Sequence, residues 1–112
     1  MEFDANLLRG TVDSIILKLV AERARYGYEI IKVINERTQG AFEWKEGTLY
    51  PCLHRLESAG LIESEWQEAG NGRKRKYYTL TRTGAAQLKG KVSEWSAFSV
   101  AVNALLIAQA PA

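Results

Sequence analysis

The spacing of hydrophobic residues changes about midway along the chain, from the three-to-four-residue period of helices to the alternation of strands. Beyond this change, residues 61–67 and 74–80 are rich in aromatic and β-branched side chains, which favour strands. The segment that joins them, 68–73, contains Asn71-Gly72, a dipeptide typical of tight hairpins. One hairpin among helical segments predicts a mainly α fold with a small β-hairpin.

Helical segments are expected before the hairpin. The first is predicted over residues 6–25, because apolar residues recur there on one face. After Tyr26-Gly27-Tyr28, a second helix is expected to about Thr38, with Gly40 in the C′ position that closes it. Residues 42–44 alternate between apolar and polar, which allows a very short strand there.

A third helix is expected from about Glu46 to Gly60. Pro51 is tolerated only in or near a first turn, so the helix begins near Glu46 or later. On a helical wheel the apolar side carries Leu49, Cys52, Leu53 and Leu56. The opposite side and its flanks present Thr48, Tyr50, Pro51, His54, Arg55 and Ser58.

A last helix is expected to follow Thr81, which suits the N-cap position, and to run almost to the end of the chain. Its residues at alternating spacings of four and three form a heptad seam: Leu88, Val92, Trp95, Ser99, Val102 and Leu106. Residues 97–112 contain no charged side chain, so one small domain cannot bury this helix alone. The pattern predicts a compact body over residues 1–80 and a homodimerisation helix over 81–112.

Positive charge is concentrated at one place. The net charge is only +2, yet Arg73, Lys74, Arg75 and Lys76 are consecutive at the end of the expected hairpin loop. A local basic tip on a nearly neutral body favours a confined contact with an anionic partner. The alternative is a hairpin tip that is simply solvated.

The order of three helices, a hairpin with a basic tip and a final helix fits a winged helix-turn-helix. In such folds the second helix of the turn motif enters the major groove, and here that helix is 46–60. The hairpin would bring the four bases against the adjacent DNA backbone, where neutralised phosphates release counterions. The expected partner is therefore double-stranded operator DNA.

Several short motifs then resemble the PadR family of transcriptional regulators. In order along residues 8–95 they are Gly27-Tyr28-Glu29-Ile30, Gly47-Thr48-Leu49-Tyr50-Pro51, Arg55-Leu56-Glu57, Gly60-Leu61-Ile62, Trp66, Gly72-Arg73, Arg75-Lys76-Tyr77-Tyr78, Leu80-Thr81 and Gly84. The single C-terminal helix is similar to that of the smaller subfamily. The resemblance implies a homodimeric, ligand-responsive repressor that binds inverted repeats in promoters.

Trp95 has two interpretations. It packs in the dimer seam, or it binds a ligand, since multidrug-sensing members of the family carry a tryptophan here that stacks planar aromatic compounds between subunits. By the same resemblance, other positions that line such a pore are Asp13, Leu17, Leu88, Val92 and Ser99. Ser99 replaces an acidic residue of that sensor, which argues against a preference for cationic drugs, although Asp13 could partly compensate.

Other residues give weaker signals for chemistry. Cys52 is the only cysteine, so no disulfide can form within the chain, which suits a cytoplasmic protein. Its thiol is expected to be packed against the core. His54 is the only histidine and lacks the Cys, His or carboxylate neighbours of a metal site. No cofactor is expected, and Trp44 and Trp66 are expected in the core around the base of the hairpin.

The sequence also bears on location and on alternative functions. No stretch is long and apolar enough to span a membrane, and the acidic start does not resemble a secretory signal. One alternative is a winged-helix module that binds proteins rather than DNA, against which the four bases argue. The other is a small enzyme with His54 as a general base, but no second titratable group converges on it.

Overall fold

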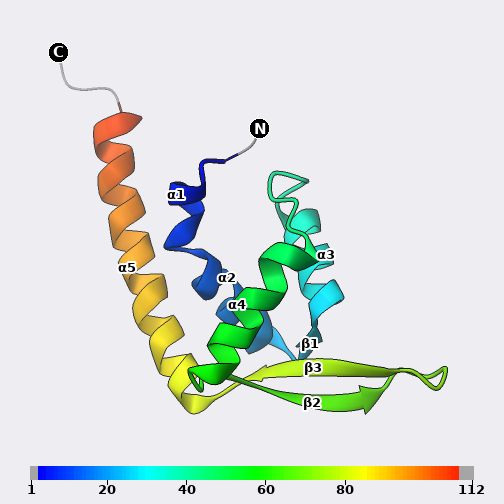
Figure 1. Ribbon diagram of the computed structural model, residues 1–112. Helices are drawn as coiled ribbons and strands as arrows, with labels where there is room; N and C mark the ends of the chain where they lie inside the picture. The colour runs from blue at the N-terminus through cyan, green and yellow to red at the C-terminus, as the bar shows by residue number, and fades with distance from the viewer. Residues whose placement is uncertain (1–2, 109–112) are drawn as a thin grey trace.

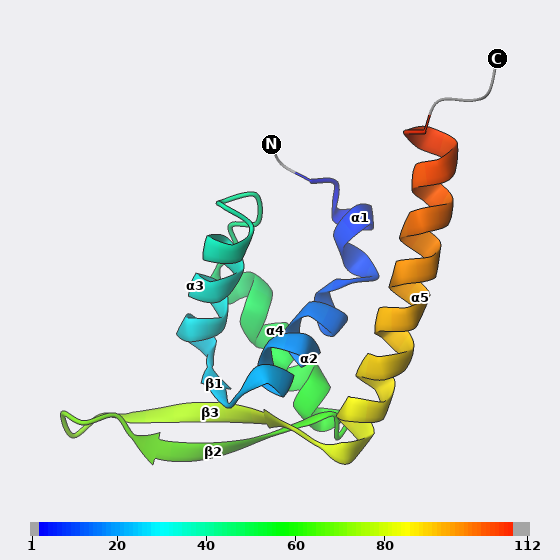
Figure 2. The same ribbon diagram turned by 180° about the vertical axis from the view of Figure 1, so that it is seen from behind.

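The computed structural model describes residues 3–108, and its elements follow the expected order (Figure 1). They are α1 (Ala5–Arg9), α2 (Val12–Glu22), β1 (Arg25–Tyr26), α3 (Gly27–Arg37), α4 (Glu46–Ser58), β2 (Ile62–Glu68), β3 (Lys74–Leu80) and α5 (Arg82–Leu106). The fold is mainly helical with a small antiparallel sheet, which confirms the predicted class. Both ribbon views show the hairpin and α5 extending away from the body formed by α2, α3 and α4 (Figures 1 and 2).

The sheet has the order β1-β3-β2, with every pair antiparallel. The hairpin register runs from Ile62 opposite Leu80 to Glu68 opposite Lys74. Gly70 and Gly72 adopt φ values of +90° and +78°, which side-chain-bearing residues rarely adopt, so both glycines serve the turn. The hairpin was predicted correctly, but β1 was not, because a two-residue strand has no local pattern.

The core lies between the three central helices and the near half of the sheet. Its fully buried side chains are Ile16, Leu17, Ile30, Leu49, Leu53, Leu56 and Ile62. Leu88, also buried, is where α5 joins this core. Burial of these apolar surfaces fixes the angle at which α4 crosses the body, and therefore which of its sides faces outward.

The single helix expected over residues 6–25 is wrong. It is broken at Gly10 and Thr11, where the Thr11 hydroxyl donates to the Leu8 carbonyl at 3.1 Å. Glycine costs helix stability, and a threonine hydroxyl competes for backbone carbonyls, so both residues favour an interruption. The second part also ends early, since the chain turns extended at Arg23 and Arg25 joins the sheet.

The end of α3 differs from expectation by one residue. Gln39, with φ +53°, takes the C′ position, and Gly40, with φ +79°, follows it. The Gly40 amide donates to Asn35 at 2.8 Å and the Gln39 amide donates to Glu36 at 3.1 Å, the pattern of a Schellman motif. The strand that residues 42–44 would allow does not form, because no strand lies beside them. Their alternation instead brings the rings of Phe42 and Trp44 together, stacked at 6.2 Å.

Helix α4 begins at Glu46 and not later, with Pro51 in its second turn. The amides of Thr48 and Leu49 both donate to the Lys45 carbonyl at 3.0 Å, which closes the first turn before the proline. Pro51 cannot donate to the Gly47 carbonyl, so one hydrogen bond of the helix is absent there. The predicted start near Glu46 is therefore confirmed, and the later start that Pro51 allowed does not occur.

Helix α5 starts as predicted, because the Thr81 hydroxyl accepts from the Gly84 amide at 3.0 Å. It then continues without a break for 25 residues to Leu106. Only its first turns pack against the body, and the described chain is accordingly extended, with a longest dimension of 66 Å. No helix between residues 3 and 108 combines the length and hydropathy that a membrane crossing requires.

Candidate nucleic-acid interface

The outward side of α4 is the first part of the candidate interface. Leu49, Leu53 and Leu56 anchor the helix in the core, so residues on the other sides remain accessible. The six residues that the sequence singled out on this helix are all exposed: Thr48, Tyr50, Pro51, His54, Arg55 and Ser58. The helix therefore presents hydroxyl, imidazole and guanidinium groups that can bond to base edges or phosphates.

Arg55 is already paired within the subunit. Its guanidinium donates to the carboxylate of Asp13, which lies at the start of α2. That hydrogen bond is the main reason why the pKa of Arg55 is raised above its ordinary value. The structure thus brings together two residues that the sequence had assigned to different sites, one for DNA and one for an effector.

The basic residues of the hairpin differ in how they are held. Lys76 lies 3.6 Å from a carboxylate oxygen of Glu57, and the Arg75 guanidinium lies 4.4 Å from the centre of the Tyr26 ring. Arg73 and Lys74 form no ion pair within residues 3–108. These two are the bases most available to a partner's phosphates.

Between α4 and the hairpin lies an open hollow of about 390 Å³. Its walls come from the start of α3, from Tyr50 of α4 and from the hairpin, whose lining residues include Lys74, Arg75 and Lys76. Tyr50 sits tightly against α3, since a Cβ atom at Gly27 would lie 2.5 Å from its hydroxyl oxygen. Gly27 is therefore required for this close approach.

Two residues of the hollow were missed or misassigned from the sequence. Tyr28 belongs to a turn signal and to a family-like motif and is assigned to no site by the sequence, yet it is 60% exposed and lines the hollow. Trp66 was expected in the core, but 62% of its surface is exposed, so that prediction is wrong. Trp44 is buried, as expected, although it packs beside Phe42 in the segment before α4.

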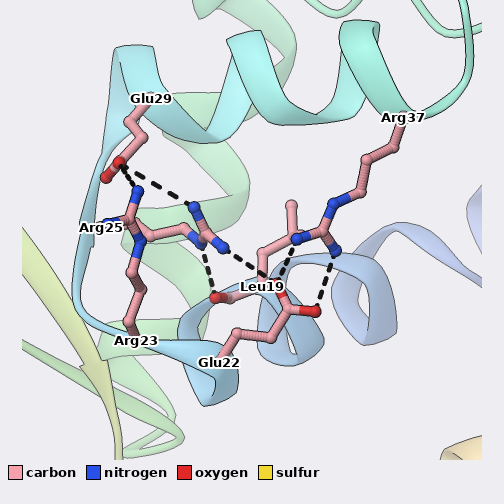
Figure 3. A network of polar contacts seen from close by, with 6 residues as sticks. All are labelled: Leu19, Glu22, Arg23, Arg25, Glu29 and Arg37. Atoms are coloured by element: carbon pink, nitrogen blue, oxygen red, sulfur yellow. Dashed lines mark hydrogen bonds and ion pairs between the residues drawn. The ribbon is translucent and has the colours of Figure 1, made fainter.

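A polar network holds α3 against α2 and so fixes one wall of the hollow (Figure 3). Arg25, only 4% exposed, donates to the Leu19 carbonyl at 2.8 Å and to Glu22 at 2.9 Å. Glu22 also accepts two hydrogen bonds from Arg37, at 2.8 and 2.9 Å. The hydrogen bonds from Arg37, followed by the one from Arg25, lower the pKa of Glu22 from 4.5 to about 2.

The residues proposed to line an effector site do not share one surface. Trp95 is 54% exposed, Val92 is also exposed, and Ser99 is half-buried on the same helix. Leu17 and Leu88 are instead buried in the core of the subunit itself, so their side chains pack there and do not reach its surface. The physical reason is that α5 lies against α2 at its base and diverges only beyond it (Figure 2).

Cys52 and His54 are the remaining candidate groups. Cys52 is half-buried beside the core and its thiol donates to the Thr48 carbonyl at 3.3 Å. Within residues 3–108, His, Cys, Asp and Glu side chains form no cluster of three that could hold a metal ion. His54 lies on the exposed side of α4.

Comparison with known proteins agrees with this arrangement. Residues 16–90 match the model of the "Transcriptional regulator PadR-like family". The chain is 46% identical over 92 residues to an uncharacterised protein of Lysinibacillus sphaericus, a match that covers 82% of this chain and 84% of the relative. It is 34% identical over 80 residues to the transcriptional regulator YqjI of Escherichia coli, which covers 71% of this chain but only 37% of YqjI.

Among solved structures, the crystal structure of a PadR-like transcriptional regulator from Bacillus cereus superposes with a TM-score of 0.82 at 32% identity. That match covers 94% of this chain and all of the other. The chain therefore belongs to the PadR-like family, whose members are transcriptional regulators and not enzymes.

Proposed function

We propose that this protein is a homodimeric repressor that binds an inverted-repeat operator, with α4 in the major groove and the hairpin against the adjacent backbone. The observation that carries the proposal is the pairing of two surfaces: an exposed polar side on α4, and the bases Arg73 and Lys74, which have no ion-pair partner in the described chain. Because its partner is promoter DNA, the protein acts in the cytoplasm.

The dimer contact in this proposal is α5. Beyond Leu88 the helix leaves the body, and its large apolar side chains are exposed: Val92, Trp95, Phe98, Val100, Leu105 and Leu106. Exposed apolar side chains in this number on one helix are typical of an association surface. A second copy supplies the same side chains around a two-fold axis, and two-fold symmetry in the protein matches an inverted repeat in the DNA.

An effector in this proposal binds between the two α5 helices, at Trp95. The indole is half-exposed and lies 6.3 Å from the ring of Phe98, so two copies would present several aromatic faces to a flat compound. Val92 and Ser99 lie one helical turn before and after Trp95, and Asp13 is partly exposed on α2. Leu17 and Leu88 are buried, so in this proposal they pack beneath the site and do not contact the ligand. A ligand that favours one separation of the subunits shifts the population of dimers that fit the operator.

Selection of bound duplexes from a random pool tests the DNA proposal. We expect enrichment of an inverted repeat whose half-sites lie about one helical turn apart, or a multiple of it. Thr48→Ala should lower the enrichment without unfolding the protein, since this side chain is exposed. Recovery of no preferred sequence, with binding that does not depend on salt, would favour the alternative of a protein-interaction module.

Tryptophan fluorescence tests the effector proposal separately. A planar aromatic dye should quench emission along a saturable curve, and Trp95→Ala should abolish this quenching while the dimer persists. Trp44 is buried and serves as the internal reference. If no panel of planar compounds binds more tightly than about millimolar, Trp95 only packs the dimer seam, and the repressor proposal stands without it.

A further inference from the structure

The inner side of the hairpin carries an unusual combination of side chains. Trp66 of β2 is directly opposite Lys76 of β3, and both line the open hollow together with Lys74. A tryptophan normally buries most of its large ring, yet Trp66 leaves 62% of its surface in solvent. Trp66 lies in the second half of β2, where every residue is exposed, and the loop end of this hairpin extends beyond the helices (Figure 1).

The facing wall of the hollow is aromatic and can donate hydrogen bonds. Tyr28, at the start of α3, and Tyr50, on α4, both line it and both are exposed. Burial of part of Tyr50, with the charge of Glu46 nearby, raises the pKa of its hydroxyl, which therefore remains a proton donor.

The charged side chains of the hollow determine which charge a bound group should carry. Lys74 and Lys76 are two positions apart on β3 and so share the face of the hairpin that carries Trp66, whereas Arg75 between them points to the other face. Lys76 is partly neutralised by Glu57 at 3.6 Å and Arg75 lies over Tyr26, which leaves Lys74 as the base without a partner in the described chain. The occupant must therefore be anionic at one point and offer an apolar or ring-shaped surface beside it. A phosphodiester with its deoxyribose has both properties.

We propose that this hollow seats the sugar–phosphate backbone of duplex DNA, with a phosphate at Lys74 and the Tyr28 and Tyr50 hydroxyls, and a deoxyribose against Trp66. The inference rests on the proposed DNA binding and adds Tyr28 and Trp66 to the interface. Because this site contacts the DNA backbone and not the base edges, it should contribute equally to the affinity for every DNA sequence. It also holds the hairpin and α4 on one stretch of backbone, which orients α4 in the groove.

The test uses the full chain and two unrelated mixed-sequence duplexes of about 30 base pairs, a length that accommodates a two-fold dimer on half-sites one turn apart. Duplex addition should change the tryptophan emission of the parent protein along a saturable curve. Trp66→Phe should remove this change, whereas Trp95→Phe should retain it. Inorganic phosphate and a mononucleotide serve as probes for a site that takes small anions instead.

Affinity measurements provide the second readout. Trp66→Ala should weaken binding about three- to tenfold on both duplexes, and it should leave the salt dependence unchanged, because the indole carries no charge. Lys74→Ala should instead reduce the slope of log K against log salt by about one unit. Gln67→Ala, an exposed neighbour on β2 outside the hollow, is the matched control and should bind as the parent does.

Each other outcome overturns the proposal in a recognisable way. If duplexes bind but Trp66 emission is unchanged and Trp66→Ala binds like Gln67→Ala, the hollow is not a backbone contact, while DNA binding stands. If phosphate or a mononucleotide reproduces the emission change at the concentration of duplex phosphate, the hollow is a small-anion site. If the parent binds neither duplex at any salt concentration, the proposed function fails and this inference with it.

Discussion

Arg55 of α4 and Asp13 of α2 form an ion pair that joins the helix proposed to read DNA to the helix that packs against α5. The two residues are 42 positions apart in sequence. Both side chains are about half-exposed, so DNA phosphates can compete with Asp13 for the guanidinium. The pair therefore links the DNA-binding side of the subunit to the side on which we propose that dimerisation and effector binding occur.

Asp13→Asn should strengthen binding to mixed-sequence DNA, because it frees Arg55 and removes a negative charge near the interface. Its effect on the free energy of unfolding should be small, about 0–1 kcal/mol, as for exposed ion pairs in general. Glu94→Gln removes the same charge from an exposed site on α5 and should change DNA affinity less. If Asp13→Asn weakens binding as much as Arg55→Ala does, the ion pair instead positions Arg55 for DNA.

Gly84 and Gly90 lie on the same helix and should respond oppositely to alanine. A Cβ at Gly84 would lie 2.0 Å from the Leu61 carbonyl oxygen. A Cβ at Gly90 would have no neighbouring atom within 4 Å among the described residues outside its own helix backbone. Gly84→Ala should destabilise the protein by about 1–3 kcal/mol or more. Gly90→Ala should stabilise it by about 0.5–1 kcal/mol through helix propensity. Urea unfolding at one fixed protein concentration measures both, and equal effects would contradict the close contact between α5 and the Leu61 carbonyl.

Glu22 should make stability depend on pH in the acid range. Its pKa is lowered from 4.5 to about 2 by Arg37 and Arg25, so its carboxylate stabilises the folded state fully above pH 4.5. That contribution is lost as the pH falls toward 2, where the folded protein also binds the proton. Glu22→Gln should therefore lower the melting temperature at neutral pH, with a difference from the parent that shrinks between pH 4.5 and 2.

Glu36→Gln is the control for this measurement, because Glu36 lies next to Arg37 on α3 and forms no ion pair within residues 3–108. It should shift the melting temperature little at any pH. A difference between Glu22→Gln and the parent that persists unchanged to pH 2 would mean that the Glu22 network does not hold α3 against α2.

Val102→Glu combined with Leu106→Glu should yield a monomer. Both residues lie in the heptad seam of α5, well beyond the part that packs against the body, so their charge should oppose association without disturbing the core. Sedimentation measures the mass, and a mobility-shift assay should show loss of operator binding. A double variant that still sediments as a dimer would mean that the subunits associate through another surface.

Local signals explain which parts of the fold were predictable. The hairpin has Asn71-Gly72, α5 has the Thr81 cap and α4 has apolar residues at helical spacing, so each was located to within one or two residues. Strand β1 has only two residues and exists because Tyr26 and its neighbour pair with β3. Such pairing depends on tertiary structure, so no local sequence pattern predicts it.

The candidate site shows the same division. The exposure of His54 and Ser58 followed from the helical period of α4, because the core fixes one side of that helix. The exposure of Trp66 did not follow from alternation. Alternation correctly places Ile62 and Trp66 on the same side of β2, but it does not predict how much of that side the helices cover. The pairing of Arg55 with Asp13 likewise depends on how α2 and α4 cross.

The central claim is that α4 reads sequence while the hairpin binds backbone, and the salt dependence of affinity tests it most directly. Affinity should be measured against salt for the parent, Lys74→Ala and Thr48→Ala, on a selected operator and on a scrambled duplex. The parent should show a steep negative slope of log K against log salt. Lys74→Ala should be shallower by about one unit on both duplexes, whereas Thr48→Ala should keep the slope and lose about 1–3 kcal/mol on the operator alone. An affinity of the parent that does not change with salt, or equal losses for both variants on both duplexes, would contradict the account.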